Sequence, residues 1–234
     1  MRARPRTPAR PARLPLASAV AICLLAGCYP GRMSVDDERF KLRTALYLQE
    51  GLLDNLTGGT PTVAVLLSDS QLNCSYTSSS DPLQANQDVA VSGAGLLREG
   101  ARTLFLLLKN PRGNTPGGEY VVRPLGSAPG STRWAEAFYM EVLESETQQK
   151  SNGDYTYEVL EWDQRVAQSD GSVDISGFAE GALEGSFDLQ DIGVEGRFSG
   201  STCELDDEQL VSLFAHAAIF YYPELIKQLD TSGG

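Results

Sequence analysis

The sequence predicts one all-β domain, a single antiparallel β-sandwich or barrel of about nine or ten strands that ends in a C-terminal α-helix. Three observations support this prediction. Short stretches of alternating apolar and polar residues recur along the chain, clusters of glycine, proline and asparagine separate them, and one strong helical pattern comes last. The chain has 234 residues, of which 41% are hydrophobic. That apolar content can fill a core and excludes a wholly disordered chain.

The amino end has the pattern of an export signal. Its first 13 residues hold five arginines and no acidic residue, and an apolar run then extends from Leu14 to Leu25. As a helix this run would reach about 18 Å, which is too short to cross ~30 Å of hydrocarbon. A basic segment followed by a short apolar segment is typical of a secretory signal peptide. We therefore expect residues 1–27 to be removed.

The residues at the end of this signal are Leu25-Ala26-Gly27-Cys28. They resemble the lipobox of bacterial lipoproteins at all four positions; the alternative is an ordinary signal peptide with a chance cysteine. The resemblance implies cleavage after Gly27 and attachment of a diacylglycerol to the thiol of Cys28. Two or three acyl chains would anchor the protein stably in a membrane. Tyr29 follows the cysteine where an Asp would favour the inner membrane, so we expect a place in the cell envelope at the outer membrane.

The chain is strongly acidic. Its formal net charge is −12, and removal of residues 1–27 takes away five more positive charges, which leaves −17. Nucleic acids and anionic lipid surfaces repel such a domain, so no nucleic-acid partner is expected. A cationic partner or bound calcium could use this acidity, but a well-solvated surface explains it more simply. Nothing in the sequence indicates a cofactor.

Two cysteines remain once Cys23 leaves with the signal and Cys28 is acylated. Cys74 and Cys203 would then share an oxidising compartment, so we predict a disulfide between them. They are too few, and too far apart in sequence, for a zinc site.

The first half of the expected domain contains several extended segments. We interpret residues 28–38 as the lipidated end and a tether, and residues 39–234 as the β-rich domain. Residues 40–48 alternate and predict a strand, with a helix as the competitor because Ser34 and Asp37 could form a capping box. Residues 61–68, 102–108 and 119–123 predict further strands, and the glycine- and proline-rich residues 110–118 between the last two predict a loop.

A long hairpin is predicted in the centre, from residues 134–146 and 155–163 around Asn152-Gly153. A two-residue turn would place Glu144 opposite Glu161, an unfavourable like-charge pair that a bulge or a longer loop would shift. Three short strands follow near Val173, over residues 183–190 and over residues 194–200. Glycines on their inward side predict close packing or strong curvature.

The last helix is predicted over residues 206–221. Asp206 can cap it, Leu205 and Leu210 can form a hydrophobic staple, and Pro223 ends or kinks it. The single histidine, His216, lies here with Ser212 and Glu208, but the serine stands between the other two, so the order needed for a catalytic triad is missing. No calcium-loop spacing occurs either. We therefore predict no catalytic residue, no metal site and no enzyme.

Aromatic residues concentrate in the central hairpin, and they supply the one binding surface that the sequence indicates. Core packing and cross-strand pairing are the competing explanation. The set is Trp134, Tyr139, Tyr155, Tyr157 and Trp162.

Three functions remain open. The first is a non-enzymatic envelope lipoprotein whose β-domain binds a protein or a glycan of the envelope. The alternative is a lipocalin-like carrier of a small ligand, although residues 29–60 lack the Gly-x-Trp pattern of that family. The least favoured is a hydrolase with two catalytic carboxylates.

Overall fold

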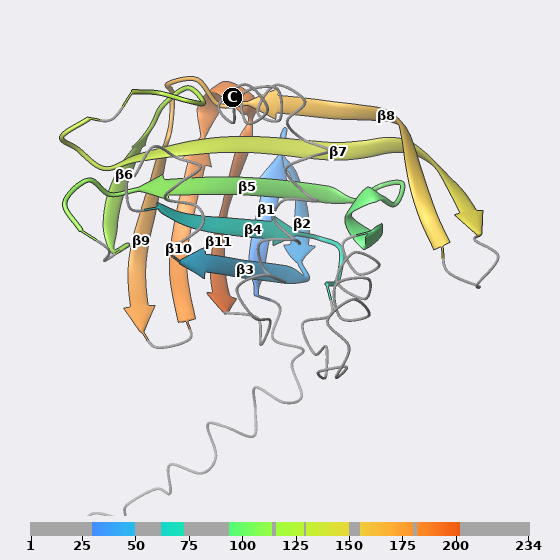
Figure 1. The fold of residues 1–234 in the computed structure, drawn as a ribbon, viewed down its shortest axis with the longest axis horizontal. Coiled ribbons are helices and arrows are strands. Elements are labelled where there is room, and N and C mark those ends of the chain that lie inside the picture. The colour runs from blue at the N-terminus through green and yellow to red at the C-terminus, as the bar shows by residue number, and fades with distance from the viewer. Residues whose placement is uncertain are drawn as a thin grey trace, which may run out of the picture.

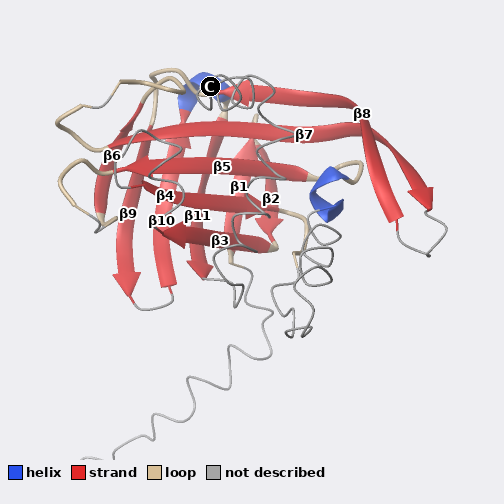
Figure 2. Ribbon diagram, viewed as in Figure 1, coloured by secondary structure: helices blue, strands red, loops and turns tan. Residues whose placement is uncertain are grey.

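A computed structural model describes residues 30–49, 62–72, 94–113, 116–128, 130–149, 155–179 and 182–201. Several predictions lie outside these residues: the signal peptide, the lipobox with Cys28, the Cys74–Cys203 disulfide, the helix at 206–221 and His216. Almost all of the described chain is β-strand, which confirms the all-β prediction (Figure 2).

The described residues form eleven strands and two short 3-10 helices. In chain order these elements are β1 (Gly31–Val35), β2 (Glu38–Leu42), β3 (Thr44–Gln49), β4 (Thr62–Ser68), η1 (Ala94–Leu97), β5 (Arg102–Lys109), β6 (Gly118–Val122), β7 (Trp134–Gln149), β8 (Tyr155–Val166), β9 (Ser172–Ala179), β10 (Ala182–Leu189), η2 (Gln190–Ile192) and β11 (Val194–Ser201).

Eight of these strands close into a flattened barrel. The first wall has the order β3-β4-β5-β7, and the second has the order β6-β9-β10-β11. The strands of one wall run across those of the other (Figure 1). Three strands lie beyond the ring: β8 extends the first wall beside β7, and the hairpin β1–β2 extends the second wall beside β11.

Strands of the two walls pair in parallel at both corners of the ring, so the sheet is closed and the domain is a barrel rather than a sandwich. At one corner Val121 and Val122 of β6 pair with Trp134 and Ala135 of β7. At the other corner a single pair, Ser201 with Leu46, joins β11 to β3. All other strand pairs are antiparallel, as predicted.

The prediction that residues 28–38 form a tether is wrong, because most of these residues belong to β-strands. β1 pairs with β11 along its whole length and forms a hairpin with β2. Asp36 and Asp37 connect the two strands, and both have positive φ angles of 49° and 68°. Positive φ at both central residues is the geometry of a type I′ turn, which matches the twist of a hairpin. Residues 34–37 therefore form a strand end and a turn, and the capping box is excluded.

The alternating stretch at residues 40–48 is extended, as predicted, but it belongs to two strands. β2 ends at Leu42, and β3 begins at Thr44 in the opposite wall. The chain changes wall at Arg43, whose backbone N–H donates to the carbonyl of Ser68 at 2.8 Å. Alternation continues through this corner, so periodicity alone shows one strand where there are two.

Large side chains fill the barrel. Eight-stranded barrels have an interior just wide enough for side chains to occupy. Both walls contribute to one buried cluster, whose bulkiest aromatic members are Tyr47, Tyr120, Tyr139, Phe187 and Phe198.

The first wall is also buried on its outer face. Ala64, Leu66 and Phe105 point away from the barrel interior and are at most 6% exposed. Phe105 stacks on Phe138 with 5.3 Å between the ring centroids. Burial on both faces explains why residues 62–68 and 102–109 form nearly continuous apolar runs.

The inward-facing Gly185 and Gly196 of the second wall lie in close contact with neighbouring strands of the same wall rather than with the facing wall. A Cβ atom on Gly196 would lie 2.5 Å from the carbonyl oxygen of Arg32 and 2.6 Å from the ring of Phe187. A Cβ on Gly185 would lie 2.7 Å from the carbonyl oxygen of Asp174. Phe187 and Phe198 occupy the space that these glycines leave, with 6.3 Å between their ring centroids.

The predicted central hairpin is present and is the longest hairpin among the described residues. β7 has 16 residues and β8 has 12, and their far ends project beyond the barrel (Figure 1). Glu144 does pair with Glu161, but the register shifts on both sides of this pair. Near the turn Gln149 pairs with Tyr155, so five residues connect the strands rather than the two of a tight turn. We call residues 142–149 and 155–162 the arm.

Candidate functional site

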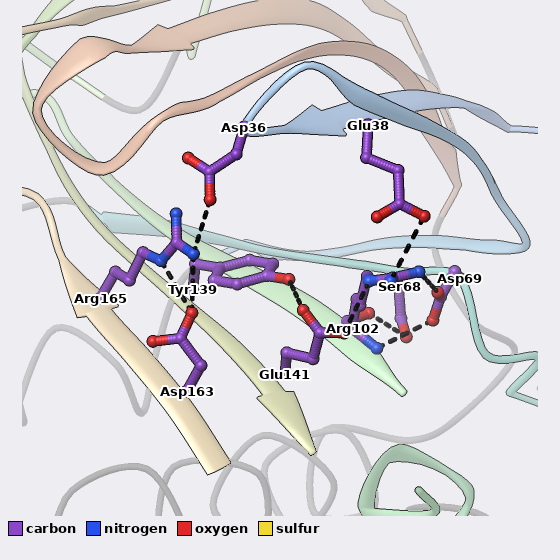
Figure 3. A network of polar contacts seen from close by, with 9 residues as sticks. All are labelled: Asp36, Glu38, Ser68, Asp69, Arg102, Tyr139, Glu141, Asp163 and Arg165. Carbon is purple, nitrogen blue, oxygen red and sulfur yellow. Dashed lines mark hydrogen bonds and ion pairs between the residues drawn. The ribbon is translucent and has the colours of Figure 1, made fainter. Parts of the chain in front are cut away.

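A network of charged side chains joins strands of the two walls (Figure 3). Arg102, at the start of β5, contacts three carboxylates: its guanidinium lies 3.1 Å from Glu141, 3.6 Å from Asp69 and 3.7 Å from Glu38. Glu38 comes from the second wall, and Asp69 and Glu141 come from the first. The guanidinium also lies 4.8 Å from the ring centroid of Phe40, which adds a cation–π contact between the walls.

Arg165 of β8 makes the second centre of this network. Its guanidinium lies 2.8 Å from both Asp36 and Asp163 and donates to the carbonyl of Ile192 at 3.0 Å. The two carboxylates raise the pKa of Arg165, and hydrogen bonding to Arg165 lowers the pKa of Asp36. This ion pair joins the β1–β2 turn to the first wall.

Tyr139 lies between the two arginines (Figure 3). Its hydroxyl donates to Glu141 at 2.9 Å, and Arg165 lies over its ring at 5.7 Å from the centroid. Burial and the bond to Glu141 raise the pKa of Tyr139 well above its usual value, so its phenol stays neutral. Burial also raises the pKa of Asp69.

Ser68 of β4 also takes part in this network. Its hydroxyl donates to the carbonyl of Arg102 at 2.8 Å, and it accepts from the backbone N–H of Ser70 at 3.0 Å and from the hydroxyl of Thr103 at 3.3 Å. The arginines are neutralised by several carboxylates each, so the arrangement holds the two walls together.

The predicted aromatic surface is not assembled as one surface. Trp134 is 1% exposed on the outer face of the first wall, Tyr139 is buried inside the barrel, and Trp162 is 47% exposed on the arm. The side chains of Tyr155 and Tyr157 lie outside the described residues. Trp134 belongs to a buried cluster with Lys109 and Glu136, because its indole N–H donates to Glu136 at 3.3 Å.

Exposed apolar side chains gather instead where the arm leaves the barrel. Trp162 lies there with two leucines that the sequence analysis did not single out, Leu143 at 45% exposure and Leu160 at 46%. Both leucines are unpaired in the ladder, at the register shifts that flank the Glu144–Glu161 pair. A bulge leaves its extra residue unpaired and bends the strand. The available sequence signal was the break in alternation at Val142-Leu143 and Val159-Leu160.

Acidic residues lie beside the exposed apolar ones on the arm, because the Glu144–Glu161 pair lies between the two unpaired leucines. Glu144, Glu146 and Glu161 are exposed, and Asp163 lies at the base of the arm. An apolar centre with a charged rim is the usual composition of a protein-binding surface, and tryptophan is enriched among the residues that contribute most to binding. We therefore take the arm as the candidate functional site.

Among the described residues, no helix has the length and apolar character needed to span a membrane. The chain matches no protein-family model, no curated protein and no solved structure.

Proposed function

We propose that this protein is a non-enzymatic lipoprotein of the cell envelope, anchored through Cys28, whose arm binds a partner protein with a basic surface. The observation that supports this best is the exposure of Leu143, Leu160 and Trp162 together on one projecting hairpin. Three exposed apolar side chains at one place favour an interaction surface, whereas single exposed ones need no explanation.

The charge of the arm indicates the kind of partner. Glu144 lies directly opposite Glu161, and such like-charge pairs destabilise a hairpin. A cationic partner would relieve this repulsion on binding, and it would also be drawn to a chain whose net charge is −17 once residues 1–27 are removed. The partner is therefore expected to present basic residues around an apolar pocket.

The lipocalin-like alternative is less well supported. A carrier of that kind needs an enclosed apolar cavity, whereas large aromatic side chains of both walls occupy the described barrel interior. Two hollows lined by described residues open to solvent on the outer surface of the second wall.

The partner proposal is tested with the double variant Leu160→Ser/Trp162→Ser. Protein extracted from native membranes is cross-linked and purified, and the amount of any stoichiometric partner is measured. We expect the variant to retain at least tenfold less of that partner. The matched control is Val121→Ser/Phe178→Ser, which removes two exposed apolar side chains from β6 and β9. Equal recovery by the arm variant, or equal loss in both variants, would show that the arm is not the binding surface.

The anchor is tested separately. The change Cys28→Ser should move the protein from the membrane fraction to the soluble fraction, and mass spectrometry of the native protein should find acyl chains on Cys28. Sedimentation of the serine variant with membranes would contradict the anchor.

A further inference from the structure

Three basic side chains lie side by side on the outer face of the second wall. Arg32 of β1 is paired with Lys41 of β2 on one side and with Arg197 of β11 on the other. Arg39 follows one ladder step further along β2. All four side chains are exposed. We call Arg32, Arg39, Lys41 and Arg197 the basic patch.

The basic patch surrounds a hollow of about 250 Å³. Arg32, Arg39 and Arg197 line it, together with the hydroxyl-bearing Ser34 and Ser186. Within the part of the chain that the structure describes, no carboxylate lies within ion-pair distance of these three arginines. Glu195 also lines the hollow, on the side toward Asp36, where it lies opposite Ser34 and Asp188 in the strand ladder. Three guanidinium groups against this one carboxylate give the lining a net positive charge, and guanidinium and hydroxyl donors suit a phosphate group.

Charge changes sign along β1. The basic pairs lie at its first residues, whereas Asp36, Asp37, Asp188 and Glu195 line a second hollow at its far end. Arg32 and Asp36 are four residues apart, which is about 13 Å along a strand. The domain is thus acidic as a whole, and among the described residues the basic patch lies at the end where the chain enters the barrel.

We propose that the basic patch contacts the anionic phospholipid headgroups of the membrane that holds the acyl chains. This inference rests on the proposed anchor at Cys28. Cys28 precedes the first residue of β1 by three positions, so the chain between them spans at most about 11 Å. That distance is close to the Debye length of ~8 Å at physiological ionic strength. Basic residues held so near an anionic bilayer are attracted to it.

This contact would fix the orientation of the barrel. Acyl chains alone leave a domain free to rotate about its attachment point, whereas a second contact on β1, β2 and β11 would hold one face against the bilayer. The acidic end of β1 would then point away from the headgroups. The overall charge predicted repulsion from anionic lipid, but the register between residues 32, 41 and 197 brings three basic side chains together on one surface.

The test uses the mature chain with Cys28→Ser, which has no acyl group, and vesicles of phosphatidylcholine with or without 30% phosphatidylglycerol at low salt. We expect binding to the anionic vesicles only, weakened about ten- to thirtyfold by Arg32→Gln/Arg197→Gln. The matched control, Arg98→Gln/Arg112→Gln, removes the same charge from exposed sites outside the second wall and should change binding less than twofold.

Three outcomes would overturn the proposal: no preference for the anionic vesicles, equal loss in both double variants, or displacement by millimolar inorganic phosphate, which would indicate a site for a soluble anion. The thermal midpoint of each variant shows whether it is folded. Because the assay contains no acyl chain, its failure leaves the anchor proposal intact. Conversely, if mass spectrometry found no lipid on Cys28 of the native protein, the anchor would be refuted. Binding of the basic patch to anionic vesicles would still be valid in that case.

Discussion

Lys109 and Glu136 form a buried ion pair on the outer face of the first wall. The Lys109 Nζ lies 2.7 Å from the Glu136 Oε1, and the two side chains are only 7% and 2% exposed. The indole N–H of Trp134 donates to the same carboxylate oxygen, and Lys109 lies 5.8 Å from the Trp134 ring centroid. Buried charges are tolerated when they are paired and hydrogen-bonded in this way.

Removing one member of this pair should be costly. Glu136→Gln leaves the ammonium group of Lys109 buried without a counter-charge, and we expect the free energy of unfolding to fall by about 3–5 kcal/mol. Urea denaturation measures the change. The double variant Lys109→Met/Glu136→Gln removes both charges and should recover most of the loss. A double variant no more stable than the single one would show that the pair is not what the single change disrupts.

Gly196 should tolerate no side chain, because a Cβ there would overlap the Arg32 carbonyl and the Phe187 ring. We expect Gly196→Ala to lower the free energy of unfolding by about 1–3 kcal/mol. Gly200→Ala is the matched control on the same strand, since its nearest neighbouring atom would be 3.5 Å away. Its effect should stay within about 1 kcal/mol. Similar losses at both positions would contradict this account of the packing.

The Asp36–Arg165 ion pair should make stability depend on pH in the acid range. The pKa of Asp36 is lower in the folded protein than its ordinary value of 3.8. Its stabilising contribution is therefore complete above pH 3.8 and disappears as the pH falls through the folded-state pKa. Stability curves of wild type and Asp36→Asn should differ near neutral pH and converge in acid. A difference that stays constant with pH would refute this role.

Tyr120 should make stability depend on pH in the alkaline range. Burial raises its pKa from 10.0 to about 12, and its hydroxyl donates to the carbonyl of Pro116 at 2.6 Å. A raised pKa means that the contribution is present below pH 10 and is lost as the pH rises toward 12. The stability of Tyr120→Phe should consequently fall less steeply than that of wild type over this interval. Parallel curves would exclude Tyr120 as the responsible group.

Most strands could be predicted from the sequence because their signal is local. β9, β10 and β11 have one face against the core and one toward solvent, so alternation marks them directly. β1 was not predicted, because it has only five residues. The turn that follows it, Asp36-Asp37, is also a weaker sequence signal for a hairpin than Asn-Gly. The closure of the barrel depends on the Ser201–Leu46 pair, and no local pattern contains that information.

The candidate sites depend even more on long-range pairing. The arm leucines are exposed because the ladder shifts around Glu144–Glu161, and the sequence does not show where such a shift falls. The basic patch exists only when residues 32, 41 and 197 are in register. Composition shows an excess of acid and gives no hint of such a cluster. Trp134 and Tyr139, five positions apart on β7, necessarily face opposite sides of a strand.

The pairing of β1 with β11 has a consequence for how the protein is made. The strand synthesised first among those described lies against the strand synthesised last. Residues 31–35 can therefore pair with β11 only after residues 194–198 have been synthesised. Contacts between such distant residues slow folding. The ring itself closes where β11 meets β3, so it cannot form until residue 201 has been synthesised. Until then the edge of the first hairpin is open to pairing with other chains, which is the stage at which a chaperone would be most useful.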